Sequence, residues 1–160
     1  MNIITALNKL GDLETSVAEL YEWYADVFAA DREASQAFAR MGTEERGHAR
    51  LVEYQRRVAQ RSPARTVEVS VDLAEIESTT GKAKSLRASP RAPQVEEAIR
   101  DALEIELSAA EAYYREALKQ ADPQMAKVLE ALAGKDQAHT KRILELAVRR
   151  RVPIPAAKAR

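Results

Sequence analysis

The chain has 160 residues, no cysteine, and 25 acidic side chains that balance 25 basic ones. The absence of cysteine excludes disulfides, iron–sulfur clusters and thiolate zinc sites, and the even charge gives no overall field directed at nucleic acid or membrane. No apolar run is long enough for a signal peptide or a transmembrane helix, so a cytoplasmic protein is expected. Because Ala, Leu, Glu and Arg dominate and Gly is scarce, the composition favours an all-α fold in one domain.

Two long helices with almost no loop between them are expected first. One spans about 3–30, and its core seam is apolar except for Glu14. Asp31 is a plausible N-cap for the next helix, which spans about 32–60 and has Glu45 on its seam. Because so few residues separate these two helices, they should form an antiparallel hairpin.

A connection of about thirty residues follows, over 61–93. Asp72 could cap a short helix within it, and Gly81 and the prolines near 90 punctuate the way into the next element. An extended segment is indicated by the alternating residues Val67, Val69 and Val71. A connection this long suits a crossover that runs the length of a helical bundle.

Two further helices are expected over about 94–120 and 123–150, with a tight proline-containing turn between them. The seam of the first carries one acid, Glu106. The seam of the second is apolar except for Asp136 and His139. Each half of the chain therefore places polar residues where leucine would be expected, and buried charge of this kind needs a partner or a metal.

The second half repeats the first in the spacing of these polar residues. Glu45 lies three residues before His48, as Asp136 lies three before His139, so each pair occupies one face of its helix. In both halves a lone Glu precedes the pair by about thirty residues, and the midpoint falls at the expected hairpin turn. Residues equidistant from such a turn lie at the same height. The set that should meet in one core layer is Glu14, Glu45, His48, Glu106, Asp136 and His139.

This layer can be interpreted in two ways. A single His or Glu on an apolar face is more often a hydrogen-bonded core residue or a registry device than a ligand. Four carboxylates in one layer, however, would repel one another strongly at low dielectric, whereas two divalent cations would offset their charge. Mixed oxygen and nitrogen ligands without sulfur suit iron or manganese better than structural zinc. Two iron ions, with manganese possible, are therefore the expected cofactors.

Neighbouring side chains extend this prediction. Tyr21 and Tyr113 lie two turns after Glu14 and Glu106 on the core face. They are either ordinary core residues or hydroxyl donors that orient ligand carboxylates. Glu44 is rotated by about 100° from the seam, so it is not expected among the ligands.

These residues resemble the ferritin-like di-iron carboxylate family, most closely its rubrerythrin and bacterioferritin branches. The matching residues are Glu14 with Tyr21, Glu45-Arg-Gly-His48-Ala49, Glu106 with Tyr113, and Asp136-Gln-Ala-His139. The resemblance covers about 3–60 and 94–150 and leaves a basic tail, 151–160, outside it. It implies a ferritin-like four-helix bundle of two antiparallel hairpins joined by a long crossover.

The sequence departs from the family at two positions. Asp136 stands where the family has Glu, and its side chain is shorter by one methylene. Ala109 stands where rubrerythrins carry an extra carboxylate, so the site resembles the bacterioferritin type more closely.

The resemblance implies a di-iron redox enzyme that reduces hydrogen peroxide or oxygen. Its electrons would come from an external donor, because the chain lacks the cysteine-ligated rubredoxin domain that many rubrerythrins append. The alternatives are a ferroxidase or iron-handling protein of the ferritin type, a hydroxylase acting on an organic substrate, and a metal-free helical interaction module. A homodimer or a higher homo-oligomer is expected, without nucleic acid or membrane as partners.

Overall fold

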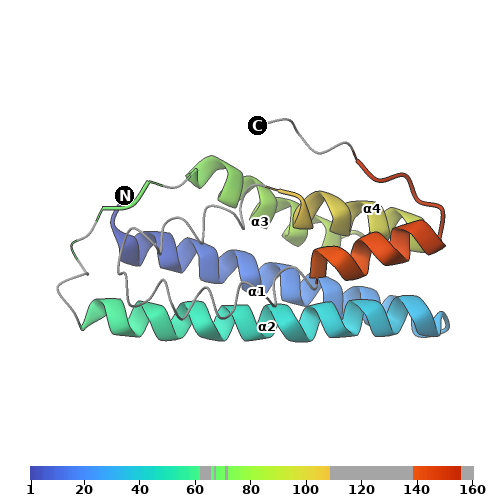
Figure 1. Cartoon of the computed structure of the whole chain (residues 1–160), viewed down its shortest axis with the longest axis horizontal. Helices are drawn as coiled ribbons and strands as arrows, with labels where there is room; N and C mark the ends of the chain where they lie inside the picture. The colour runs from blue at the N-terminus through green and yellow to red at the C-terminus, as the bar shows by residue number, and fades with distance from the viewer. Residues whose placement is uncertain (62–65, 67, 71, 109–138, 156–160) are drawn as a thin grey trace.

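The computed structural model describes residues 1–61, 66, 68–70, 72–108 and 139–155, and this part of the protein is helical apart from one isolated β-bridge (Figure 1). An all-α protein is thus confirmed for the described residues, in which no helix is long and apolar enough to cross a bilayer. Asp136, Tyr113 and the expected turn before the last helix lie outside them. The helices are α1 (Ile3–Val27), α2 (Arg32–Gln60), α3 (Leu73–Arg87), α4 (Val95–Glu106) and an unlabelled helical segment, 139–149.

Helices α1 and α2 form the predicted hairpin and lie side by side along their length (Figure 1). Helix α1 ends three residues earlier than expected, and residues 28–31 form the whole connection. Asp31 caps α2 as predicted, because its Oδ1 accepts a hydrogen bond from the Ala34 N–H at 3.2 Å. Near the middle the backbones approach closely, since a Cβ at Gly42 would lie 3.3 Å from the Ala18 carbonyl oxygen.

Helix α3, in the crossover, is longer than the short helix expected there. Asp72 caps it as predicted, but the helix continues through Gly81 to Arg87. A Cβ at Gly81 would meet nothing within 4 Å, so this glycine lies on the open side of the helix. The buried side consists of Ile76, Thr79 and Ala83. Burial of this side against α1 outweighs the roughly 0.5–1 kcal/mol that a glycine costs inside a helix.

Near its start, the crossover contacts the first residue of the chain, and from there it follows α1. Val69 is buried and exchanges two backbone hydrogen bonds with Met1, of 2.8 and 3.1 Å. Further along, ion pairs join Lys9 to Glu77 and, ten residues on in each helix, Glu19 to Arg87. Helix α3 therefore runs parallel to α1. Of the three alternating valines only Val69 lies among the described residues, next to Glu68, which forms an isolated antiparallel β-bridge with Asn2.

Helix α4 runs antiparallel to α1. The hydroxyl of Tyr24 donates to Asp101, while the hydroxyl of Tyr21, one turn earlier in α1, donates to Glu106, one turn later in α4. The helix predicted over 94–120 begins where expected but ends earlier, at Glu106, because Leu107 and Ser108 form a turn and a bend; residues 109–120 lie outside the described part. Gln94 caps α4 through a capping box with Glu97.

The segment 139–149 runs antiparallel to α2. Arg142 pairs with Glu44, and Arg149 pairs with Glu33 near the start of α2. Figure 1 shows this segment beside α4, at the end of the molecule where α1 turns into α2. Helices α1 and 139–149 consequently point one way, and α2 and α4 point the other.

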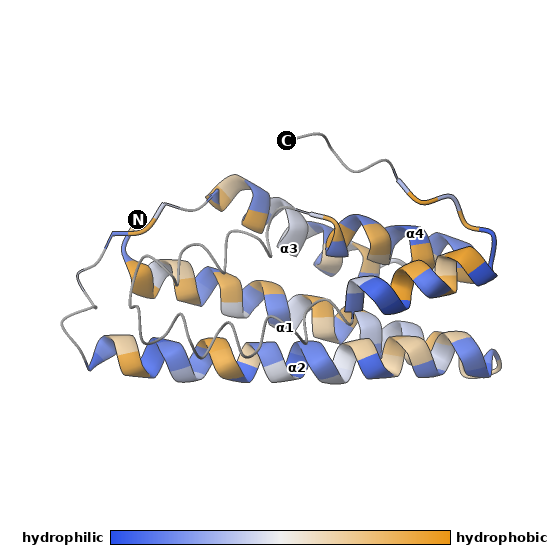
Figure 2. Ribbon diagram, viewed as in Figure 1, coloured by the Kyte–Doolittle hydropathy of each residue, from blue (hydrophilic) through white to orange (hydrophobic). Residues whose placement is uncertain are grey.

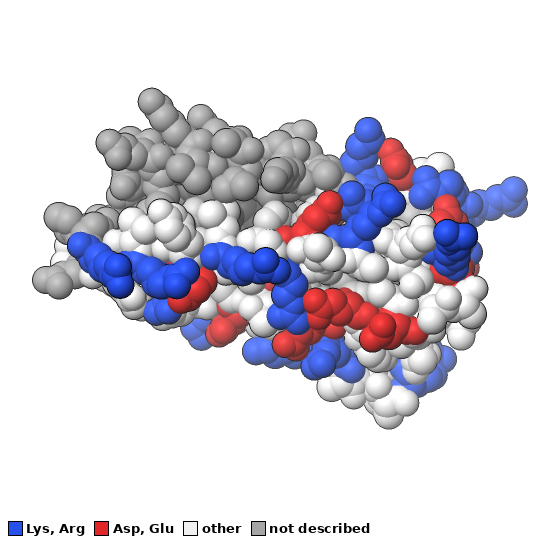
Figure 3. All heavy atoms as spheres, turned by 90° about the horizontal axis from the view of Figure 1, so that it is seen from below, with Lys and Arg blue, Asp and Glu red and all other residues white. Residues whose placement is uncertain are grey.

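Helix α1 is the central helix of the described part, because α2, α3 and α4 all contact it. Figure 2 shows that apolar residues recur along its whole length, and its buried aromatic residues Tyr21 and Tyr24 pack with Phe38 of α2. On the face seen in Figure 3, acidic and basic side chains lie next to one another. Ion pairs at the surface of the described part include Arg46 with Glu22 and Arg56 with Glu53.

Candidate metal centre

Glu45 lies between two imidazoles that come from different parts of the chain. Its Oε1 is 2.8 Å from Nδ1 of His139, and its Oε2 is 3.2 Å from Nδ1 of His48. The two rings are stacked, with centroids 5.0 Å apart and an interplanar angle of 21°. One potential ligand atom from each of the three residues lies within 4.8 Å of the others. The structure therefore brings together three of the six residues selected from the sequence.

Glu14 approaches this group from α1. Its carboxylate is 3.6 Å from Nδ1 of His48, and the side chain is buried. Burial raises the pKa of Glu14 well above its usual value, because a buried carboxylate loses the solvation that favours its ionised form. The contact with His48 acts in the opposite direction, and the neighbouring charge of Glu45 adds to the rise. Glu14 is thus a carboxylate that a cation in this layer would help to ionise.

The carboxylate of Glu45 behaves differently although it is equally buried. Burial alone would raise its pKa, but the hydrogen bonds with His139 and then His48 outweigh burial and hold the pKa of Glu45 below its usual range. An ionised carboxylate with two imidazole nitrogens facing it is a donor set of the kind that binds transition metals. Each of these two short contacts requires a proton between the atoms, and a cation bound to all three groups would replace those protons.

Glu106 is buried at the end of α4 and is held from α1. The Tyr21 hydroxyl donates a hydrogen bond of 2.8 Å to its Oε1, and both residues are buried. Of the two sequence interpretations of Tyr21, core residue or donor to a carboxylate, the structure shows both at once. The carboxylate that Tyr21 contacts lies across the helix interface, in α4. The matching residues Tyr113 and Asp136 lie outside the described part of the chain.

Glu44 and Arg142 are neighbours of the cluster that sequence reasoning did not select. One Glu44 oxygen is 3.0 Å from Nε2 of His139, and both oxygens contact the Arg142 guanidinium, at 2.5 and 3.2 Å. The oxygen lies at ion-pair distance from Nε2 but without hydrogen-bond geometry, so Nε2 makes no hydrogen bond among the described residues. A carboxylate that accepts a hydrogen bond from the outer nitrogen commonly orients a ligating histidine; Glu44 lies in that place, at ion-pair distance.

One signal in the sequence could have identified this contact. Glu44 adjoins Glu45, and Arg142 lies three residues after His139. If α2 and the segment 139–149 are antiparallel and Glu45 meets His139, then Glu44 and Arg142 lie on the sides of the two helices that face each other. The pairing could be proposed only once the neighbouring helix was known.

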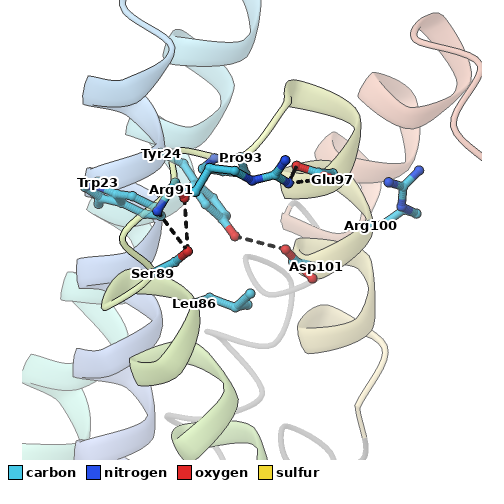
Figure 4. A pocket seen from close by; sticks show the side chains of 9 residues that line it. All are labelled: Trp23, Tyr24, Leu86, Ser89, Arg91, Pro93, Glu97, Arg100 and Asp101. Atoms are coloured by element: carbon cyan, nitrogen blue, oxygen red, sulfur yellow. Dashed lines mark hydrogen bonds and ion pairs between the residues drawn. The ribbon is translucent and has the colours of Figure 1, made fainter.

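A cavity of about 300 Å³ elsewhere in the molecule is a weaker candidate site. It lies between α1, the loop before α4, and α4 itself (Figure 4). Figure 4 shows Tyr24 donating to Asp101, at 3.2 Å, and Arg91 paired with Glu97. Burial raises the pKa of Asp101 and also that of Tyr24, where the adjacent carboxylate adds to the effect. The described lining of this cavity contains no histidine, so the Glu45 cluster, with two imidazoles beside a carboxylate, is the better candidate metal site.

Comparisons with models of protein families, with curated proteins and with solved structures found no match to this chain. The function of the chain is therefore inferred from the residues of the candidate site and their geometry.

Proposed function

We propose that Glu45, His48 and His139 form the centre of a dinuclear metal site, completed by Glu14, Glu106 and Asp136, in a ferritin-like bundle. The observation that carries this proposal is the position of Glu45, whose two oxygens each face an imidazole nitrogen in a buried layer. A carboxylate with one oxygen toward each histidine is suited to lie between two ions. His48 would bind one ion and His139 the other.

The helix directions support a ferritin-like arrangement. Helices α1 and 139–149 point one way, α2 and α4 point the other, and a long crossover follows α1 between the two halves. Two antiparallel hairpins joined by such a crossover are the arrangement in which ferritin-like proteins place inward-facing carboxylates and histidines. The rest of the helix predicted up to residue 120 and the start of the last helix would complete this bundle.

The donor set favours iron or manganese. Carboxylate oxygens and imidazole nitrogens without thiolate suit these metals, and bound iron would supply one-electron redox chemistry for the reduction of hydrogen peroxide or oxygen. The chain's own contribution is to hold the ligands and exclude water. Tyr21 fixes Glu106 by its hydrogen bond, and Glu44 contacts His139 from outside. Electrons would come from an external donor, because the chain has no cysteine-ligated centre.

The decisive experiment is an anaerobic titration of metal-free protein with Fe²⁺, followed by metal analysis after desalting. We expect about two ions per chain in the native protein, as in ferritin-like dinuclear sites, and loss of at least one ion in Glu45→Ala. Glu53→Ala is the matched control, because Glu53 lies on the same helix in an exposed ion pair with Arg56. A native protein that retains neither Fe²⁺ nor Mn²⁺ would exclude the site.

The redox part of the proposal is tested separately. Ferrous-loaded native protein should consume added hydrogen peroxide as its iron is oxidised, and the loaded protein should be reducible again by a one-electron donor. Glu45→Ala should consume peroxide no faster than free Fe²⁺ at the same concentration. If native protein binds two ions but reacts no faster than free Fe²⁺, the site is a metal store or a structural site and not a redox centre.

A further inference from the structure

A very small cavity lies beside the candidate metal ligands. The centre of a sphere the size of a water molecule can occupy about 10 Å³ of this cavity. Its lining combines two of the candidate ligands, two hydroxyl residues and three apolar residues, namely Glu14, Glu45, Thr79, Ser108, Leu13, Val17 and Ile105. Thr79 comes from the crossover helix α3, and Ser108 lies just after α4. The cavity thus joins the crossover to the metal layer.

The polar groups around this cavity are buried, and one of them has no hydrogen-bond partner among the described residues. The exposed fractions of Glu14, Glu45 and Thr79 are 5%, 1% and 7%. The Oγ of Ser108 is buried and makes no hydrogen bond within the described part of the protein. A buried hydroxyl left without a partner costs about 1–3 kcal/mol. A ligand that hydrogen-bonds to Ser108 would remove this cost.

The size and chemistry of the cavity suit one water molecule. A cavity needs roughly 10–15 Å³ of such space to hold one water, and the water needs two to four polar partners. The Ser108 hydroxyl, the Thr79 hydroxyl and the Glu14 carboxylate can provide three. Leu13, Val17 and Ile105 supply the apolar part of the lining, and the small volume leaves no room for a larger polar ligand.

We propose that this cavity binds a single water molecule that links Thr79 of the crossover helix to the Glu14 carboxylate, with Ser108 as a further partner. Thr79 is then a positioning residue, because it acts on a candidate ligand through the water. The water site itself does not depend on a metal. Its effect on metal binding rests on the function proposed above.

The crossover helix is suitably fixed for this role. Helix α3 is anchored along α1 by buried Ile76 and Ala83 and by ion pairs at both of its ends. A hydroxyl on such a helix has a defined position relative to α1, which carries Glu14. The crossover therefore helps to orient a metal ligand as well as to connect two halves of a bundle.

The water site is tested first in metal-free protein. A high-resolution crystal structure of the full chain should show one ordered water within hydrogen-bond distance of Ser108 Oγ and the Glu14 carboxylate. An empty cavity, or a Ser108 hydroxyl bonded to another protein group, would overturn the proposal. This result does not depend on whether the protein binds iron.

The role of Thr79 is tested by cobalt titration, with Co²⁺ absorption as a probe of ligand geometry. Thr79→Val keeps the side-chain shape and removes the hydroxyl, and we expect about tenfold weaker Co²⁺ binding and shifted visible bands. Thr80→Val is the matched control, because the Thr80 hydroxyl donates to Ile76 O of its own helix, at 2.7 Å. Thr79→Ser keeps a hydroxyl, so this variant should bind Co²⁺ as the native protein does.

The outcomes separate the two proposals. If Thr79→Val and Thr80→Val both bind Co²⁺ as the native protein does, with an unchanged spectrum, Thr79 has no positioning role. If native protein binds neither cobalt nor iron, the proposed metal function fails, while the crystal structure of the metal-free protein still decides whether the water is present.

Discussion

Two imidazoles contact Glu45 from segments that are 94 and 3 residues away in the chain, and each contact joins one of its oxygens to an Nδ1 atom. In metal-free protein these contacts offset the charge of a carboxylate that is almost fully buried. A bound ion would offset this charge instead, and it would displace the protons that lie between Glu45 and the two Nδ1 atoms. The contacts therefore stabilise this residue without metal, so that the proposed site could assemble before any ion binds.

Glu44 should affect the strength of metal binding without being a ligand. In Glu44→Gln the carboxylate beside Nε2 of His139 becomes neutral while the side chain keeps its size. We expect about tenfold weaker Fe²⁺ binding with unchanged stoichiometry at saturation, measured by competition with a chelator. The exposed substitution Glu53→Gln should leave the affinity unaltered. Native affinity in Glu44→Gln would show that its contact with His139 has no bearing on the metal.

At the residue scale, helix periodicity and the repeat predicted that Glu45, His48 and His139 lie close together, as they do in the structure, while their role as metal ligands stays a prediction. The spacing of Glu45 and His48 placed both on one helix face, and the repeat in the second half indicated His139 as their partner. Spacing could not show that Glu44 touches His139, because this contact depends on the rotation of one helix against another. Thr79 could not be selected at all, since nothing in the crossover sequence indicated which residues face the core.

At the scale of the helices, the approach of α1 and α2 depends on one glycine. A Cβ at Gly42 would lie 3.2 Å from the Glu22 backbone nitrogen and 3.3 Å from the Ala18 carbonyl oxygen. Backbone atoms cannot move aside as the end of a flexible side chain can. The two helices must therefore separate slightly if this residue gains a side chain.

Gly42→Ala should accordingly destabilise the protein by about 1–3 kcal/mol, the usual range for overpacking. Gly47→Ala is the matched control on the same helix, because a Cβ there would meet nothing within 4 Å. Removing this helical glycine should stabilise the protein by up to about 1 kcal/mol. Urea unfolding of both variants in metal-free form measures the difference, and effects of the same sign would contradict this account of the helix contact.

The extents of the helices were predictable where caps and seams agree. Asp31 and Asp72 cap the helices that the sequence assigned to them, and α2 has the expected bounds. Helix α3 was underestimated because Gly81 suggested a break, whereas its buried side continues past that residue. A local signal from one exposed glycine was outweighed by packing that involves a distant segment, which sequence reasoning cannot weigh.

At the scale of the whole molecule, metal binding and stability should be linked. Because the metal binds the folded state, an ion present at 100 times its dissociation constant would add about 2.7 kcal/mol to the free energy of unfolding. For a domain of this size, that corresponds to a rise in melting temperature of roughly 5–10 °C. Melting curves with Mn²⁺ and with excess chelator should differ accordingly. Glu45→Ala should show a smaller difference, and coincident curves for the native protein would contradict the linkage.

The short connection between α1 and α2 also bears on the order in which the chain folds. Only residues 28–31 separate these helices, so closing the hairpin carries a small entropic penalty, and such local contacts form early. Glu14, Glu45 and His48 meet as soon as the hairpin closes. His139 joins Glu45 across 94 residues, once the last helix has docked. A nascent chain would thus hold half of the proposed ligands long before the rest, and tight retention of an ion at this site would report that folding is complete.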